Sequence, residues 1–297
     1  NNKWTLPTTT DGKLSVRVGA GGLGGDAASN IDQMRGSSSF IGDNLVEYSN
    51  DTNAVSTPAD LSFIQSLGGG GGACVNTSRG SKVGSRGASG GGSAAGQGRS
   101  VSVSSAVYDD SDPVTKGYPG GSAENDTTVE FVISGGGGGA GGPGGDSNAD
   151  TRKSGDGGTG LSSSISSSGQ MSYSGGGGGG MYIAGTSTPQ SGSGSGGGGN
   201  GGEGNFDGIN NVVLLSATPG QANTGGGGGG GVYYLESGEN GGSGIVIVRY
   251  TIPPTPVIID EQCSNSGLPE GVTTSDDPGN CIVEFKTPGI EYDVTLP

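Results

Sequence analysis

The residue types that carry most enzyme chemistry are sparse in this chain, and one of them is missing. The 297 residues include no histidine, which excludes Ser-His-Asp and Cys-His catalysis and every His-ligated metal site. Adjacent acids occur at Asp109-Asp110 and Asp276-Asp277, but neighbouring acids in turns are usually solvated rather than arranged for glycoside hydrolysis. The only Gly-Lys pair, Gly12-Lys13, precedes Leu14 instead of the Ser or Thr of a phosphate loop. We therefore expect this protein not to be an enzyme.

One stretch carries oxygen ligands at the spacing of a calcium loop. Asp146, Asn148 and Asp150 stand at the first, third and fifth positions of such a loop. The pattern then fails, because Thr151 stands where glycine is required and Gly157 stands where the bidentate glutamate belongs. These three residues are the candidate calcium ligands, and we expect no other cofactor.

The cysteines suggest a disulfide near the end of the chain. Cys263 and Cys281 lie 18 positions apart in a short acidic segment, and a bridge closing such a loop contributes on the order of 3 kcal/mol. We favour this bridge over two free thiols because so small a segment has little core of its own. Cys74 is then left over, either free or paired with another molecule. Secretion is also compatible with three Asn-X-Ser/Thr glycosylation sequons, at Asn50, Asn76 and Asn125.

Composition limits the ways in which this chain can be stabilised. Glycine accounts for 71 of the 297 residues. Leu, Ile, Val and Phe together account for about 18% of them, a share that is typical of disordered chains. In a folded chain of this kind, backbone hydrogen bonds must replace much of the missing hydrophobic core. Glycine suits that role because it offers a donor and an acceptor with no side chain in the way.

The charge balance is strongly acidic. The formal net charge is −15, from 28 acidic and 13 basic residues, and no Lys or Arg occurs between Lys153 and Arg249. So few cations cannot neutralise a phosphate backbone, which argues against nucleic acid as a partner. No apolar run approaches the roughly 18–20 residues that span a bilayer. We interpret the charge as a source of solubility and self-repulsion.

The glycines gather in five blocks, at Gly68–Gly72, Gly135–Gly139, Gly175–Gly180, Gly196–Gly199 and Gly225–Gly231. Collagen is excluded because glycine does not recur at every third position. Flexible linkers are disfavoured because short apolar or aromatic segments flank the blocks closely. Two interpretations remain: a packed array of left-handed, polyglycine-type extended helices, which we favour, and glycine-rich β-structure with bulges. In the array, three residues make a turn and backbone groups point in three directions.

Predicted strands flank these glycine blocks. Alternating apolar residues predict strands at 14–18 and 129–133, and both lead into glycine-rich runs. This repeated order, a strand followed by a glycine-rich run, divides a glycine-rich body, residues 1–250, into two degenerate copies at about 1–134 and 128–250. The predicted fold class is mostly β and irregular, with little α-helix.

One helix is predicted over residues 57–67. Thr57 is a candidate N-cap and Pro58 stands at the first helical position. Leu61, Ile64 and Leu67 follow at helical spacing before Gly68 ends the segment.

Residues 251–297 are predicted to form a Pro-rich connector and a small acidic β tail. Strands are expected at 257–259, 282–285 and 290–296. In the last strand, apolar side chains alternate at Ile290, Tyr292, Val294 and Leu296. Two interpretations stay open: an ordinary small β module, and a strand donated to the sheet of a neighbouring molecule.

Several segments resemble a known family. The opening Trp4-Thr5-Leu6-Pro7, the stretch Leu14–Gly22 and the ending Gly241–Tyr250 look like the glycine-rich domains of phage tail-fibre and adhesin proteins and of secreted microbial surface proteins. The likeness covers about residues 1–250. For phage adhesins, the resemblance implies glycine helices packed into a sandwich, with loops at its tip that contact host receptors. Aromatic residues make up only 5% of this chain, which weakens the receptor-binding interpretation.

These observations favour a structural subunit of an extracellular or surface fibre or filament, assembled through the glycine-rich body and terminal strands. The expected partner is a second copy of the chain. The alternative is a phage tail-fibre adhesin on a virion surface, whose partner would be a cell-surface glycan or protein.

Overall fold

The computed structural model describes residues 13–25, 36–37, 39–42, 63–66, 68–73, 89–93, 117–123, 125–126, 131–184, 190–206, 209–233, 235–251, 269–277 and 280–295. Within this part of the chain there is no α-helix or 3₁₀-helix, and short strands alternate with extended glycine segments. The predicted class, mostly β and irregular around a glycine-rich body, is therefore confirmed.

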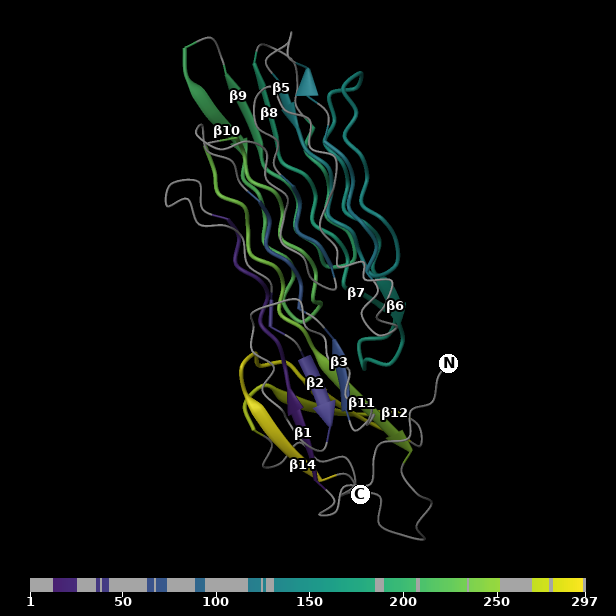
Figure 1. Cartoon of the computed structure of the whole chain (residues 1–297). Coiled ribbons are helices and arrows are strands. Elements are labelled where there is room, and N and C mark those ends of the chain that lie inside the picture. The colour runs from purple at the N-terminus through teal and green to yellow at the C-terminus, as the bar shows by residue number, and fades with distance from the viewer. Residues whose placement is uncertain are drawn as a thin grey trace.

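The molecule is elongated, with sheets towards its two ends and a layer of long extended segments between them (Figure 1). We call the lower end in Figure 1 the base, the upper sheet the top sheet, and the extended glycine segments between them the array. The first and the last described strands, β1 and β14, both lie at the base (Figure 1).

Two sheets pack together at the base. The first has the order β14 (Glu291–Thr295), β1 (Lys13–Arg17), β2 (Ser39–Gly42) and β3 (Phe63–Ser66), and the second has the order β11 (Val246–Thr251), β13 (Asn280–Phe285) and β12 (Val272–Asp277). All pairs in both sheets are antiparallel. Their shared core contains buried side chains from both sheets: Val16, Val18, Cys281, Val283 and Phe285. The tail strands thus complete a sandwich with the first and last strands of the body.

The top sheet gathers strands that continue out of the array. Its order is β10 (Asn211–Leu215), β9 (Glu203–Phe206), β8 (Met181–Ala184), β5 (Phe131–Ile133) and β4 (Asn125–Asp126). β8 and β9 are parallel because the glycine runs that precede them climb the array side by side. The remaining pairs are antiparallel. A separate hairpin of β6 (Leu161–Ser163) and β7 (Met171–Tyr173) lies nearer the base (Figure 1).

The predicted strand at 14–18 corresponds to β1, and the tail strand at 282–285 falls within β13. Of the predicted strand at 129–133, residues 131–133 form β5 and residues 129–130 lie outside the described residues. The predicted helix is wrong where the structure describes it, because Phe63–Ser66 forms β3 and pairs with β2 from Ser39↔Ser66 to Gly42↔Phe63. Sheet pairing overrides the helical spacing there, since an aromatic and a β-branched residue suit a strand equally well. Residues 57–62, Leu67 and the predicted strand at 257–259 lie outside the described residues.

Candidate functional site

The run Gly225–Gly231 shows how the array is built. Its N–H groups bond to three neighbouring segments in rotation, with N···O distances of 2.9–3.0 Å: Gly227 and Gly230 donate to Gly175 and Gly178, Gly228 and Gly231 to Gly70 and Ala73, and Gly229 to Thr218. Residues three apart therefore meet the same neighbour. That repeat is the three-residue turn of an extended, polyproline-like helix.

The carbonyl groups of this run face three further segments. They accept hydrogen bonds of 2.7–3.0 Å, from Gly199 and Gly202 on one side, from Gly92 on another, and from Glu239 and Gly242 on the third. Gly175–Gly180 is also surrounded on all sides, through bonds with residues 90, 137, 155–158, 192–195, 196–199 and 227–230. Two runs with six neighbours each make a hexagonal array of polyglycine-type helices. This arrangement confirms the first of the two interpretations of the glycine blocks and rejects the second.

The spacing of the array leaves no room for a side chain. An ideal Cβ on Gly177 would lie 2.0 Å from the carbonyl oxygen of Gly228, and one on Gly229 would lie 1.8 Å from that of Asn200. Real Cβ atoms do not approach oxygen so closely. In both cases the nearest atoms belong to the backbone of a neighbouring segment, which cannot move aside as the end of a flexible side chain can. The array therefore requires glycine because glycine has no side chain. Carbonyl oxygens come close to the glycine Cα atoms instead, as in the Cα–H···O contacts between strands of β-sheets.

Polar side chains cap the rim of the array. Outer segments leave some N–H groups facing no neighbouring run, and Asn or Asp side chains accept bonds from them at 2.8 Å: Asp156 Oδ1 from Ser193 N, Asn200 Oδ1 from Gly194 N, and Asn240 Oδ1 from Gly24 N. All three capping residues are followed by two glycines. Sequence reasoning missed these residues, although the Asn/Asp-Gly-Gly triplet, one turn long, could have identified them.

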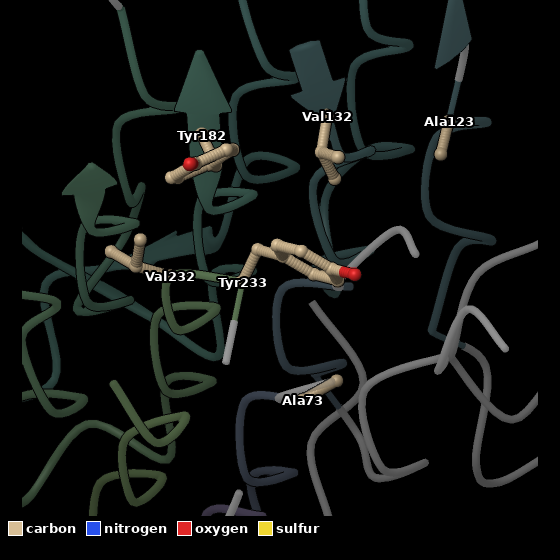
Figure 2. Packing of buried hydrophobic residues seen from close by; sticks show 6 residues of the cluster. All are labelled: Ala73, Ala123, Val132, Tyr182, Val232 and Tyr233. Carbon is tan, nitrogen blue, oxygen red and sulfur yellow. The ribbon is translucent and has the colours of Figure 1, made fainter. Parts of the chain in front are cut away.

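An apolar cluster closes the array beneath the top sheet. Tyr182 of β8 and Tyr233 lie with ring centroids 5.7 Å apart at 53°, and Val132, Val232, Ala73 and Ala123 surround them (Figure 2). The Tyr182 hydroxyl donates to Asn211 Oδ1 at the start of β10. These residues directly follow or flank glycine runs, so side chains gather where the close backbone packing ends.

A buried carboxylate ties the tail to the body. Glu284 of β13 is only 3% exposed, and its Oε1 accepts bonds from Ser166 Oγ at 2.6 Å and Ser167 N at 3.2 Å in the loop between β6 and β7. Its Oε2 lies 2.7 Å from Lys286 Nζ. Burial raises the pKa of Glu284, but the hydrogen bonds from Lys286 and Ser166, with the charge of Lys286, outweigh it and hold the pKa below its usual value. This junction joins the hairpin, which belongs to the body, to a tail strand 117–118 positions away.

The candidate calcium ligands have structural partners. Asp146 Oδ1 accepts a 2.6 Å bond from Ser122 N, and Asn148 Oδ1 accepts one of 2.8 Å from Thr151 N. Asp150 is exposed in the same turn. Among the described residues, no group of three or more His, Cys, Asp or Glu side chains is arranged to hold a metal ion. The first two ligands therefore act as caps and turn formers here, and calcium binding stays a prediction.

Other predicted site residues are only partly described. Cys281 is buried in the base, while Cys263, Cys74, Asn50 and Asn76 lie outside the described residues. The disulfide and glycosylation at those two sequons therefore stay predictions. The third sequon, at Asn125, begins β4 at the edge of the top sheet.

The predicted assembly strand is β14. It pairs with β1 of its own chain over five residue pairs, from Lys13↔Thr295 to Arg17↔Glu291. Tyr292 and Val294 lie within it, Ile290 precedes it and is 40% exposed, and Leu296 lies outside the described residues. A strand that sequence analysis offered for a neighbouring molecule thus completes its own sheet, as an edge strand.

In the part that the structure describes, no helix is long and apolar enough to cross a membrane.

Comparison with known proteins identifies a family for this chain. No curated protein and no solved structure matches the chain. The sequence model of the family described as "Glycine-rich domain" matches residues 1–251, a range that contains every glycine run of the array. The protein therefore belongs to this glycine-rich domain family.

Proposed function

We propose that this protein is a structural subunit of an extracellular or surface fibre or filament. The observation that carries the proposal is the array itself. Most hydrogen bonds in its interior join backbone to backbone, and buried serines such as Ser93 and Ser154 also bond to its backbone. Among the described residues, Asn and Asp side chains cap its rim. Such a body offers length and stiffness, since a seven-residue run at ~3.1 Å per residue spans roughly 20 Å.

Assembly would proceed by exchange of β14. The pairing of β14 with β1 is made within one chain here, and the same register formed between two chains would link them without any new contact. Open-ended exchange of this kind generates filaments rather than closed dimers when the rotation between subunits does not close. Strand addition at a sheet edge is a recurrent mode of recognition because backbone bonds supply the affinity.

Electron microscopy of the purified full chain tests this proposal. Long homopolymeric filaments are the expected result. A synthetic peptide with the sequence of residues 290–297 should block their growth, because it competes for β1, and a peptide with the same composition in scrambled order is the control. Protein that stays as single particles at high concentration would contradict the proposal.

A second candidate function is a phage tail-fibre adhesin that recognises a host surface. Four exposed aliphatic side chains at the end opposite the base favour it, because an adhesin needs an uncovered recognition surface: Ile209, Val212, Leu214 and Leu215. Binding of the purified monomer to intact cells, lost when these side chains are made polar, would support this function over the filament.

A further inference from the structure

We infer that the exposed edge of the top sheet is a dimer interface between two copies of this chain, made by antiparallel pairing of β10 with β10. Among the strands that the structure describes, β10 pairs with β9 alone, so its second edge is open at the side of the sheet (Figure 1). The inference extends the proposed self-assembly, but the contact is separate from the exchange of β14 at the base.

The side chains of β10 divide into an anchored set and an exposed set. Val213 packs inward against the apolar cluster of the top sheet, and Asn211 accepts a bond from the Tyr182 hydroxyl. Val212 is 39%, Leu214 53% and Leu215 51% exposed. The strand is thus fixed from within while it presents three aliphatic side chains to solvent, and fixed surfaces bind with a smaller entropic cost than mobile ones.

A β-bulge shapes this surface. The register with β9 shifts between Val213 and Leu215, and the extra residue lets Leu214 and Leu215 both stay exposed instead of alternating between faces. The same bulge twists the strand beyond Val213 and limits the length that can pair with another edge. A short self-complementary contact around a two-fold axis fits that limit better than open-ended sheet growth.

Charge favours a second copy as the occupant. The chain carries a net charge of −15, yet no charged residue occurs from Gly208 to Leu235. Two copies can therefore meet at β10 without placing like charges opposite each other. Of the acids that flank this stretch, Asp207 lies outside the described residues, and the two that are described bond to backbone of their own chain: Glu203 Oε1 accepts from Ser191 N at 3.0 Å, and Glu236 Oε2 accepts from Ala217 N at 3.0 Å.

Sedimentation analysis of the full chain over a wide range of concentration tests the inference. With filament growth blocked by the peptide of residues 290–297, the wild-type protein is expected to form dimers, and Leu214→Lys should weaken dimerisation about tenfold or more by placing a charge at the edge of the sheet. Leu161→Lys is the matched control, because Leu161 is 60% exposed on β6, far from β10, and its replacement should leave the dimer unchanged. Mixing Leu214→Lys with Leu214→Asp should restore a mixed dimer.

Three results would overturn the inference. The first is wild-type protein that stays monomeric, and the second is Leu214→Lys protein that dimerises as the wild type does. The third is monomeric protein that binds vesicles of phosphatidylcholine only when Leu214 is intact, which would assign this edge to a lipid surface. Filaments that persist while Leu214→Lys abolishes the dimer would support both proposals, whereas dimers without filaments would leave this inference standing and reject exchange of β14.

Discussion

A methyl group on Gly177 would lie 2.0 Å from the carbonyl oxygen of Gly228, in the contact between the two runs that have neighbours on all sides. Conformation is not the reason for glycine there, since among the residues of these two runs only Gly225 has a positive φ, of 68°. The obstacle is backbone held by further backbone, so a side chain cannot be accommodated by a change of rotamer. The distance between neighbouring glycine runs therefore decides whether a position in the array tolerates a side chain.

Gly177→Ala should lower the free energy of unfolding by on the order of 3 kcal/mol or more, because overpacking against fixed backbone forces the runs apart. Urea unfolding followed by circular dichroism measures the change. Gly169→Ala provides the control, because its Cβ would meet nothing within 4 Å. With a φ of +85°, that variant should lose only roughly 1–2 kcal/mol. Equal losses in the two variants would show that the array is looser than described.

Asn240→Ala should destabilise the protein by about 1 kcal/mol, because the N–H of Gly24 loses its acceptor at the rim of the array. Asn240→Asp keeps an oxygen at that position and should retain most of the stability. Thermal unfolding of the two variants and the wild type makes the comparison. An Asn240→Ala protein as stable as the wild type would mean that water replaces the cap without cost.

At the scale of elements, short strands and long glycine runs have different tasks. The runs hold one another in the array, while most of the buried large apolar side chains that the structure describes lie in or beside the strands at both ends. The loop between β6 and β7 reaches the tail strand β13 through Glu284. The contact between the body and the tail therefore depends on a titratable side chain, the carboxylate of Glu284.

Stability should fall in acid partly through Glu284. Its pKa in the folded protein is below the usual 4.5, so its contribution is fully present above about pH 4.5 and is lost as the pH falls through the folded-state pKa. Glu284→Gln should cost about 1–3 kcal/mol at neutral pH and flatten the dependence of unfolding free energy on pH. Urea titrations across the acidic range measure both effects. Asp156, whose pKa is also lowered, remains as a further source of pH dependence in the variant.

The sequence predicted the array because glycine blocks with closely spaced apolar edges leave few alternatives, and it predicted β1 and β5 from simple alternation. It failed at Phe63–Ser66, where helical spacing and strand propensity coincide and only pairing with β2 decides. It also could not place the partners of Asn240 or Glu284. Asn240 bonds to a residue 216 positions away in the sequence, and Glu284 bonds to one 118 positions away. The residues next to Asn240 and Glu284 in the sequence do not indicate such distant partners.

At the scale of the whole molecule, the array binds the chain into one unit. Runs from 68–73, 89–93, 175–180 and 225–231 exchange hydrogen bonds directly, although they are spread over most of the sequence. Each bond contributes only about 1 kcal/mol net, and ordering glycine carries a high entropic cost. Stability must therefore come from many bonds acting together, with the apolar clusters at the two ends.

Hydrogen exchange should reveal that cooperativity. The amides of Gly92, Gly177, Gly228 and Gly230 are expected to exchange at one common slow rate, because none can open without separating several runs. The exposed residues of the loop between β6 and β7, outside its junction with Glu284, should exchange faster. Mass spectrometry of peptides after deuterium labelling gives the rates. Independent rates for the separate runs would contradict a single cooperative unit.

The three-residue turn of the runs has a consequence for how such proteins can change in length. Each residue rotates the chain by about 120°, so an insertion of one glycine in Gly225–Gly231 would turn every later amide towards the wrong neighbour. Adding a whole turn restores the original directions and only lengthens the rod. Related glycine-rich domains are therefore expected to differ by multiples of three residues within their runs, and by any number in the loops that join them.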